Sequence, residues 1–262
     1  MSIQPWVHVE TFEEYKERFK DFAILERTED GILYCQLTWK GGPVMWSYQT
    51  QHAYGELWTA IGHDKKNEVL ILTCTDPYWL VHESDPSSFD EIENGTDVDA
   101  KYNVNIPDTM NFVENFINDI EIPTIAAING QGMHYEFALM SDITLCVPEY
   151  SFSDAHFSRN IVGGDGMNFA MRTCLKVKES NYFMFMEPQI PAEKALQMGI
   201  INEIVEHDKL IERAYEIAIR PWKASLHENE RIHVLCEMYG VQLNKFEHHF
   251  DKIVEEFDAK RG

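Results

Sequence analysis

Residues 123–166 of the chain read PTIAAINGQGMHYEFALMSDITLCVPEYSFSDAHFSRNIVGGDG, and this stretch decides the fold. It begins with an apolar run over residues 123–129 that Gly130 ends, a pattern typical of a strand buried on both faces. We expect a short helix over residues 134–140 and a second buried strand over residues 143–147. A strand, a helix and a strand in succession form the repeating unit of an α/β layered fold.

The same alternation continues on both sides of this stretch. Upstream, apolar runs at residues 22–25 and 32–39 flank the turn sequence Thr-Glu-Asp-Gly and predict a β-hairpin. The other expected elements are helices at residues 10–22, 46–61, 107–120, 191–198 and 208–219, strands at 69–73 and 200–205, and two further segments at 167–173 and 180–186. This alternation predicts an α/β fold with a mostly parallel sheet.

The last forty or so residues differ from the rest. From residue 222 onward the pattern is helical and charged, without strand signals. We therefore divide the chain into a core domain of residues 1–220 and a C-terminal helical region of residues 221–262. An acidic, irregular stretch from residue 85 to residue 102 is a candidate loop or lid.

The composition excludes several functional classes. The chain has 262 residues with 44 Asp and Glu against 22 Lys and Arg, a formal net charge of −22. A nucleic-acid binder needs a basic stripe, and no basic cluster stands out here. The five cysteines are scattered and odd in number, which indicates small buried side chains in a reducing compartment. No run approaches the roughly 20 apolar residues of a membrane span. We expect a cytoplasmic protein that binds neither membrane nor nucleic acid.

Within residues 123–166, the order of motifs resembles the crotonase (enoyl-CoA hydratase/isomerase) superfamily. The shared frame is Ala-Ile-Asn-Gly, a glycine-containing turn, Glu-Phe-Ala-Leu-Met-Ser-Asp at residues 136–142, Phe-Ser-Asp-Ala-His at 152–156, and Gly-Gly-Asp-Gly at 163–166. The segment at residues 190–205 is similar to the next landmark of the family. The resemblance covers roughly residues 22–220 and implies a crotonase-like core whose C-terminal helices help subunits form trimers or dimers of trimers.

The departures from the family pattern bear on the chemistry. CoA-dependent members carry a run of glycines before the glutamate-containing helix, whereas this chain has the sequence Gln-Gly-Met-His-Tyr at residues 131–135. The turn at residues 78–85, where the family places its other oxyanion donor, has no glycine. Hydratases also keep a catalytic glutamate where this chain has His156. The backbone oxyanion hole for a CoA thioester is therefore not expected.

This replacement pattern resembles the β-diketone hydrolase branch of the superfamily. Members of that branch pair a histidine with an aspartate nine residues later, which His156 and Asp165 match. His134 matches a histidine on the turn before the helix, and Trp46 and His52 match an upstream tryptophan and histidine. The resemblance implies a non-esterified, often cyclic 1,3-diketone substrate and a retro-Claisen cleavage by water, without a metal or an organic cofactor.

The residue types suit that reaction. Histidine is a natural general base near neutral pH, and His156 would take a proton from the attacking water. A carboxylate on the other ring nitrogen, here Asp165, would fix the tautomer and stabilise the imidazolium. The departing enolate needs a hydrogen-bond donor, for which His134, His52 and the indole N–H of Trp46 are candidates.

Several alternatives remain open for individual residues. Asp154 is a rival partner for His156, and Asp165 between two glycines could serve only a turn or cap the next helix. Glu136 matches a glutamate that is catalytic in hydratases and here has either a structural role or a polar contact to substrate. Trp79, Tyr78 and Tyr135 either wall a substrate pocket or pack as ordinary aromatic residues.

Two other functions compete with diketone hydrolysis. One is an enoyl-CoA hydratase or isomerase that acts on a CoA thioester with Glu136 and Asp165. The other is a non-enzymatic scaffold that keeps the fold for binding.

Overall fold

The structure is a computed structural model, and it describes residues 8–80, 83–85, 106–154, 156, 166–186 and 189–219. Its centre is a 6-stranded sheet in the order β1-β2-β4-β7-β9-β12. These strands are Ala23–Arg27, Ile32–Leu37, Val69–Cys74, Thr124–Ile128, Ile143–Cys146 and Glu203–Ile204. Only β1 runs antiparallel to its neighbour, and the other pairings in this sheet are parallel. The predicted α/β fold with a mostly parallel sheet is confirmed.

The strands follow from the sequence pattern. β4 and β7 are buried along their whole length, as expected for central strands covered on both faces. β1 and β2 form the predicted hairpin, with Ala23 opposite Leu37 and Arg27 opposite Leu33. The hairpin forms the edge of the sheet, where one face of β1 is exposed and its burial alternates.

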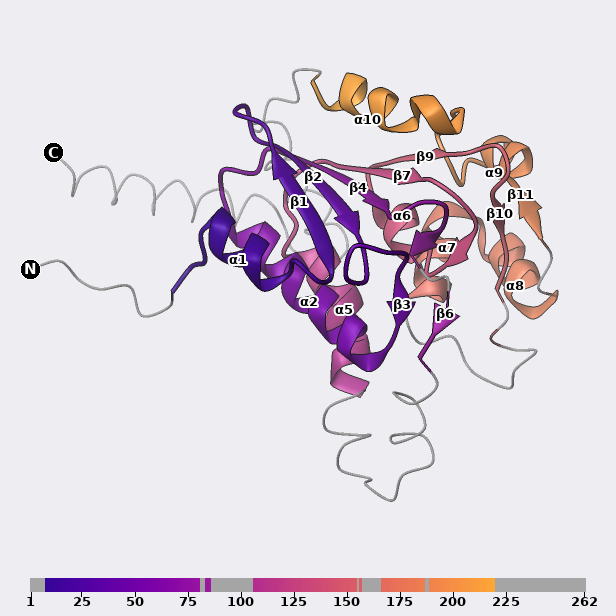
Figure 1. Cartoon of the computed structure of the whole chain (residues 1–262). Helices are drawn as coiled ribbons and strands as arrows, with labels where there is room; N and C mark the ends of the chain where they lie inside the picture. Colours follow the sequence, from indigo (N-terminus) through magenta and orange to yellow (C-terminus); the bar gives the residue numbers. More distant parts are fainter. Residues whose placement is uncertain are drawn as a thin grey trace, which may run out of the picture. The chain divides into compact units, whose positions relative to one another are not determined.

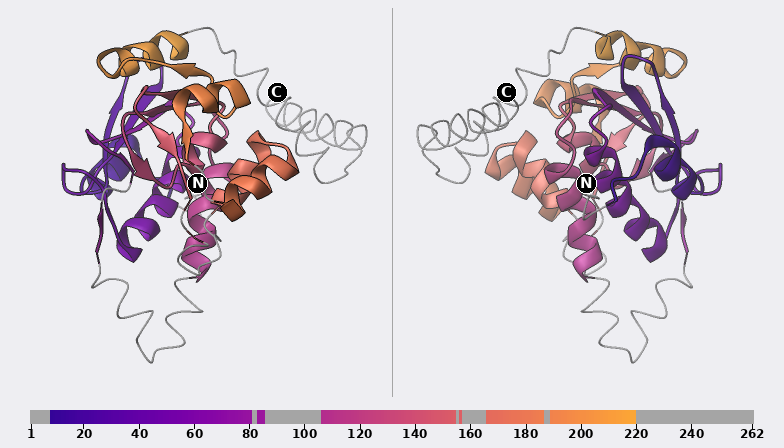
Figure 2. Two further views of the ribbon diagram at one scale, coloured as in Figure 1. Left: turned by 90° about the vertical axis from the view of Figure 1, so that its right-hand side faces the viewer. Right: turned by 90° about the vertical axis from the view of Figure 1, so that its left-hand side faces the viewer.

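Helices cover the two faces of this sheet (Figure 1). α1 (Phe12–Arg18), α2 (Tyr48–His63) and α5 (Ile106–Asn118) lie on one face, and α10 (Leu210–Ala218) crosses the other. The two views in Figure 2 show the same separation, with α10 on the side away from α2 and α5.

Aromatic rings fill the space between α2, α5 and α6 (Glu136–Met140). Phe112 meets Phe137 edge to face at a centroid distance of 4.3 Å. Phe116 packs against both Phe137 and Trp58, at 5.1 and 5.2 Å. Each such pair adds about 0.5–1.5 kcal/mol beyond its area burial. This aromatic cluster anchors α6, and with it the turn that precedes α6.

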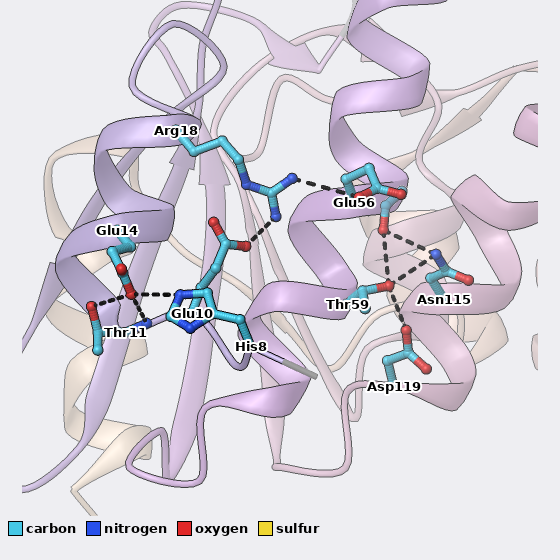
Figure 3. A network of polar contacts seen from close by, with 10 residues as sticks. His8, Glu10, Thr11, Glu14, Arg18, Glu56, Thr59, Asn115 and Asp119 are labelled. Carbon is cyan, nitrogen blue, oxygen red and sulfur yellow. Dashed lines mark hydrogen bonds and ion pairs between the residues drawn. The ribbon is translucent and has the colours of Figure 1, made fainter. Parts of the chain in front are cut away.

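A polar network holds the outer surfaces of α1, α2 and α5 together (Figure 3). Thr11 and Glu14 form a capping box at the start of α1, with the Thr11 N–H donating to Glu14 at 2.8 Å. Arg18 of α1 pairs with Glu56 of α2 at 3.5 Å. Thr59 of α2 donates to Asp119 at 2.6 Å, just after α5 ends. These contacts set the position of α2, which begins next to the candidate site.

Three two-stranded sheets form where loops leave the central sheet. β3 (Met45–Trp46) pairs with β6 (Glu83–Ser84), β5 (Trp79–Leu80) with β8 (Gly132–Met133), and β10 (Ser151–Phe152) with β11 (Ile190–Pro191). The remaining helices of the described residues are α7 (Met167–Cys174), α8 (Val177–Met186), α9 (Ala192–Met198) and the single turn η3 (His207–Lys209). α9 ends as predicted at Gly199, whose φ of 76° suits a glycine C-cap.

Some predicted elements have other boundaries than expected. The helix expected from residue 46 begins at Tyr48, because Ser47 caps it by accepting the Thr50 N–H at 3.1 Å. Trp46 therefore lies in β3 rather than in the helix. The helix expected at residues 10–22 covers only α1, and the strand at 200–205 only β12.

Three predictions cannot be placed on this fold. The C-terminal helical region at residues 221–262 and nearly all of the acidic stretch at residues 85–102 lie outside the described residues, and so does Cys236. Cys35, Cys74 and Cys146 are buried, in agreement with the prediction, whereas Cys174 is partly exposed. Among the described residues, no helix combines the length and apolar character needed to cross a bilayer.

Buried acids predict how the fold responds to alkali. Burial raises the pKa of the Cys35 and Cys74 thiols above their ordinary value of 9.0 and that of the Tyr54 phenol well above 10.0. Such groups stay protonated when folded but ionise when unfolded, so their stabilisation is complete below about pH 9 and is lost as the pH rises. Each group removes about 1.4 kcal/mol of unfolding free energy per pH unit above its unfolded pKa.

Urea unfolding between pH 8 and pH 11 tests this expectation. Above pH 10 the free energy of unfolding should fall less steeply for Tyr54→Phe than for the unchanged chain, because one ionising group has been removed. Equal slopes for the two proteins would contradict the prediction.

Candidate active site

The candidate site forms where the loops after β4 and β7 meet. The carboxyl ends of neighbouring parallel strands lie at one edge of the sheet, which is the usual place for ligands in α/β folds. After β4 the chain enters β5, and after β7 it enters β8, so that Trp79 lies opposite Gly132 and Leu80 opposite Met133. The two segments therefore approach each other as parallel backbones immediately before His134.

The approach of these backbones requires a glycine. A Cβ on Gly132 would lie 1.7 Å from the carbonyl oxygen of Trp79, far inside van der Waals contact. The Trp79 N–H already donates to the carbonyls of Gly130 and Gln131, each at 3.2 Å. This backbone N–H is therefore bonded to the facing loop.

The backbone of His134 is held in an unusual conformation. Its φ is 56°, and that of Leu80 on the facing strand is 35°. Side-chain-bearing residues rarely adopt positive φ, and such conformations persist where surrounding contacts enforce them, often at functional sites. Here the indole N–H of Trp79 donates to the His134 carbonyl at 3.2 Å and fastens the residue in place.

The side chain of His134 is bonded to Glu136. Its Nδ1 lies 2.7 Å from Oε1 of Glu136, and the two side chains are 9% and 0% exposed. On one face the imidazole stacks on Trp46, with ring centroids 4.0 Å apart and planes 23° from parallel. Phe112 meets the ring edge to face at 6.0 Å. The histidine and its carboxylate are thus enclosed by aromatic rings.

His156 forms a second pair of the same kind. Its Nδ1 contacts Oδ1 of Asp154, and the His156 backbone N–H donates to the same oxygen at 3.0 Å. Asp154 is 1% exposed at its side chain, whereas His156 is 19% exposed. A carboxylate oxygen beside Nδ1 favours the tautomer whose proton lies on that nitrogen.

Contacts between the two segments bring these histidines into one region. Gln131 bridges to Ser151, donating to its carbonyl at 2.9 Å and accepting its N–H at 3.1 Å. Tyr135 packs edge to face on Phe152 at 5.2 Å. The segment that leads to Asp154 and His156 therefore lies against the turn that carries His134.

The other predicted site residues differ in where they lie and in how far they are buried. Trp46, Trp79, Tyr135 and Glu136 all gather around His134 and are buried. His52 on α2 is 59% exposed at its side chain and bonds Asp108 of α5 at 3.1 Å. Asp165, predicted as the partner of His156, lies outside the described residues. Asp154, which the sequence offered as a rival, is bonded to His156.

Sequence reasoning missed two residues around the site. Phe112 and Asp108 lie on α5 and contact His134 and His52, respectively. In the sequence both read as ordinary positions of an amphipathic helix. No local signal distinguishes them, since their contacts depend on how α5 packs against α2 and the turn before α6.

Other polar features of this sheet edge are separate from the histidine pairs. A cavity of about 80 Å³ lies on the α10 side, where Asp76 accepts from Asn129 at 2.7 Å and meets His207 at 3.0 Å. It contains none of the predicted site residues. Within the part of the chain that the structure describes, no three His, Cys, Asp or Glu side chains converge as a metal site requires.

Comparison with known sequences identifies the family of the chain. A family model described as enoyl-CoA hydratase/isomerase matches residues 54–236. A carnitinyl-CoA dehydratase of Salmonella typhi is 33% identical over 104 residues, which are 39% of this chain and 40% of that protein. The chain thus spans less than half the length of the curated relatives it matches.

Solved structures give longer similarities. A β-diketone hydrolase of the cyanobacterium Anabaena sp. PCC 7120, bound to (S)-3-oxocyclohexyl acetic acid, has a TM-score of 0.77 and 26% identity, covering 87% of this chain and 90% of that one. An enoyl-CoA hydratase/isomerase of Mycobacterium paratuberculosis has a TM-score of 0.69 and 19% identity, covering 82% of this chain and 86% of that one. The second similarity concerns the fold alone.

The close approach at Gly132 generates a prediction about the site. We expect Gly132→Ala to lower the free energy of unfolding by about 1–3 kcal/mol, because the new methyl group overlaps a backbone carbonyl that cannot rotate away. It should also separate Trp79 from His134. Thermal unfolding and the fluorescence of the buried tryptophans measure the two effects.

Gly42→Ala is the matched control. A Cβ there meets its nearest atom, the Trp39 carbonyl oxygen, at an ordinary 3.7 Å. This variant should stay within about 0.5 kcal/mol of the unchanged chain. Equal stability of the two variants would show that the β5–β8 contact is not as tight as described.

Proposed function

Because this chain belongs to the enoyl-CoA hydratase/isomerase (crotonase) family, we propose that its site hydrolyses a carbon–carbon bond in a 1,3-diketone. Two histidines beside carboxylates suit this reaction. The reaction is a retro-Claisen cleavage that gives a keto acid. A cyclic diketone is the preferred substrate class, since the similar Anabaena hydrolase binds a cyclic keto acid.

One observation carries the proposal. Two histidines of the site, His134 and His156, each place Nδ1 on a carboxylate, Glu136 and Asp154 respectively. Each imidazole is thereby oriented to act through Nε2, one as a proton acceptor and the other as a donor. Diketone hydrolysis needs both actions, on water and on an enolate oxygen.

The first step is the attack of water. His156 takes a proton from water through Nε2 while the water oxygen forms a bond to one carbonyl carbon of the diketone. The resulting imidazolium is stabilised by the carboxylate on Nδ1, a role that we assign to Asp154. Asp165, nine residues after His156, is proposed as a further carboxylate of this site, and separate variants distinguish the two.

The second step breaks the carbon–carbon bond. The tetrahedral intermediate collapses to a carboxylic acid, and the bonding electron pair leaves as an enolate on the second carbonyl. His134 donates a hydrogen bond to that enolate oxygen, an interaction for which one donor is commonly worth about 2.7–4 kcal/mol of barrier. His156 then returns its proton to the enolate carbon, so that water has been added across the broken bond.

The remaining predicted residues would shape the pocket. We propose that Trp46, Trp79 and Tyr135 form its wall and that His52, paired with Asp108, is a further donor to substrate. The family resemblance also leads us to propose a homo-oligomer, a trimer or a dimer of trimers. Glu136 would hold the His134 ring through its contact with Nδ1.

The second candidate function is a CoA-thioester hydratase or isomerase. It is favoured by the similarity to carnitinyl-CoA dehydratase over 104 residues and by the presence of Glu136. It is disfavoured by the occupation of Glu136 Oε1 by His134 and by a histidine at position 156.

A hydrolysis assay tests the proposal. The substrate is a bridged bicyclic 1,3-diketone whose cleavage gives 3-oxocyclohexyl acetic acid. In it, the carbon that becomes the carboxyl group is bonded to ring carbon 4. Formation of the keto acid is measured without added CoA or metal. His156→Ala should lower kcat by about 10²–10⁴-fold with the fold intact, since it removes the general base. The exposed His63 at the end of α2 provides the control, His63→Ala, which should keep full activity.

Further arms separate the alternatives. Asp154→Asn should lower kcat more than Asp165→Asn, because Asp154 is assigned the role of orienting His156. The reverse order would identify Asp165 as the orienting carboxylate. Full activity of His156→Ala would refute the mechanism. Absence of diketone turnover in the unchanged chain, together with CoA binding in calorimetry, would favour the thioester enzyme instead.

A further inference from the structure

The cavity of about 80 Å³ on the α10 side lies apart from the two histidine pairs. It is lined by residues of β2, by the ends of β4 and β7, and by η3 and α10. One water molecule occupies about 30 Å³ in the liquid, so a group of about two or three heavy atoms fits. The side chains of Asp76 and His207 are 63% and 52% exposed, so solvent reaches the rim of the cavity. A small ligand can therefore enter from solution.

Asn129, which lines this cavity, carries an unused hydrogen-bond acceptor. The residue is 5% exposed, and its side-chain nitrogen donates to the Cys74 carbonyl at 3.0 Å and to Oδ1 of Asp76 at 2.7 Å. A carbonyl and a carboxylate only accept, so the amide has a single orientation, with its nitrogen toward both. Among the described residues, no donor reaches the buried Oδ1 of Asn129. Buried polar atoms normally have a partner, so this oxygen points to a ligand that donates hydrogen.

Asp76 brings negative charge to the same cavity. Within the described residues, both of its side-chain contacts, from Asn129 and from Nε2 of His207 at 3.0 Å, reach Oδ1. The other carboxylate oxygen, Oδ2, is thereby left to a ligand. The part of the lining that the structure describes contains no Lys or Arg. A cation is therefore attracted to the cavity, whereas an anion would meet the Asp76 carboxylate with no lysine or arginine to balance it.

The hydroxyl and amide donors of the lining are used within the protein. The Tyr34 hydroxyl donates to Oε1 of Gln36 at 2.9 Å, and Nε2 of Gln36 donates to the Thr75 hydroxyl at 3.1 Å. The Thr73 hydroxyl donates to the Ala127 carbonyl at 2.8 Å. These bonds leave the cavity richer in acceptors than in donors, so the ligand that suits it carries several N–H groups.

We propose that this cavity is a second binding site, and that it binds a small primary alkylammonium ion. The charge of the ion complements Asp76, and its three N–H donors suit single acceptors such as Oδ1 of Asn129 and Oδ2 of Asp76. A guanidinium prefers both oxygens of one carboxylate, and Oδ1 of Asp76 already meets two donors. Leu210 and Ile211 of α10 give the alkyl carbon an apolar wall. The site does not depend on the proposed diketone hydrolysis.

NMR of the full chain with ¹⁵N-labelled asparagine tests the binding directly. Methylammonium chloride is titrated at pH 8 and constant ionic strength, and the side-chain amide signals of Asn129, assigned by their loss in Asn129→Ser, should shift and saturate. Tetramethylammonium chloride carries the same charge without N–H donors, so it should cause no saturable shift. No saturable shift with methylammonium would overturn the proposal, because water alone would then fill the cavity. An equal response to both salts would overturn it as well.

Asp76→Asn tests the role of the carboxylate. The variant keeps the size of the side chain and removes its charge, so the Kd for methylammonium should rise at least about tenfold. Asp21→Asn is the matched control, since Asp21 is exposed and does not line the cavity, and it should keep the Kd of the unchanged chain. An unchanged Kd in a folded Asp76→Asn would overturn the assignment of the site.

Ile211→Lys gives a second test that leaves the polar contacts of Asp76 in place. Ile211 lines the cavity and is partly exposed, so the new side chain can bring its own ammonium group to the acceptors. We expect this variant to weaken the binding of methylammonium at least about tenfold, and thermal unfolding checks that it is folded. If Asp76→Asn does not fold, Ile211→Lys decides. Undiminished binding of methylammonium by Ile211→Lys would contradict the proposed location.

Discussion

The bond between Glu136 and His134 is the constraint on which the site depends. A buried acid and a buried base are each unfavourable alone, and together they remove most of that cost. The aromatic rings of Trp46 and Phe112 keep water away from the pair and leave the imidazole one orientation. The backbone of His134 is held as well, because its positive φ is accompanied by a hydrogen bond from the Trp79 indole N–H to its carbonyl.

In the proposed reaction, side-chain donors take the place of backbone donors. A glycine-rich turn presents backbone N–H groups, which need little space and carry no charge. Here the turn holds His134, and the backbone N–H of Trp79 on the facing strand donates to the carbonyls of Gly130 and Gln131. Side-chain donors reach farther than backbone donors, but they must be held in place, and in the proposed site the contacts of His134 with Glu136 and of His156 with Asp154 would do this.

The residues predicted from the sequence meet in the structure to different extents. His134, Trp46, Trp79, Tyr135 and Glu136 converge, because they lie on segments that the sheet order brings to one edge. Their spacing of two positions makes Asp154 the less favoured partner of His156 in the sequence, yet the two side chains are in contact in the structure. His156 lies in a turn, and its backbone N–H donates to the same Asp154 oxygen, so the local hydrogen bond holds the two residues together.

The sequence by itself determined the elements and their order, because hydrophobic periodicity, caps and turn residues act over a few neighbouring positions. The hairpin of β1 and β2, the buried strands β4 and β7 and the end of α9 at Gly199 all follow from such local signals. Only the tertiary structure decided that Phe112 packs on His134 and that Gly132 must lie against Trp79. Those contacts join positions far apart in the chain, and their geometry is set by the packing of helices and loops rather than by any local preference.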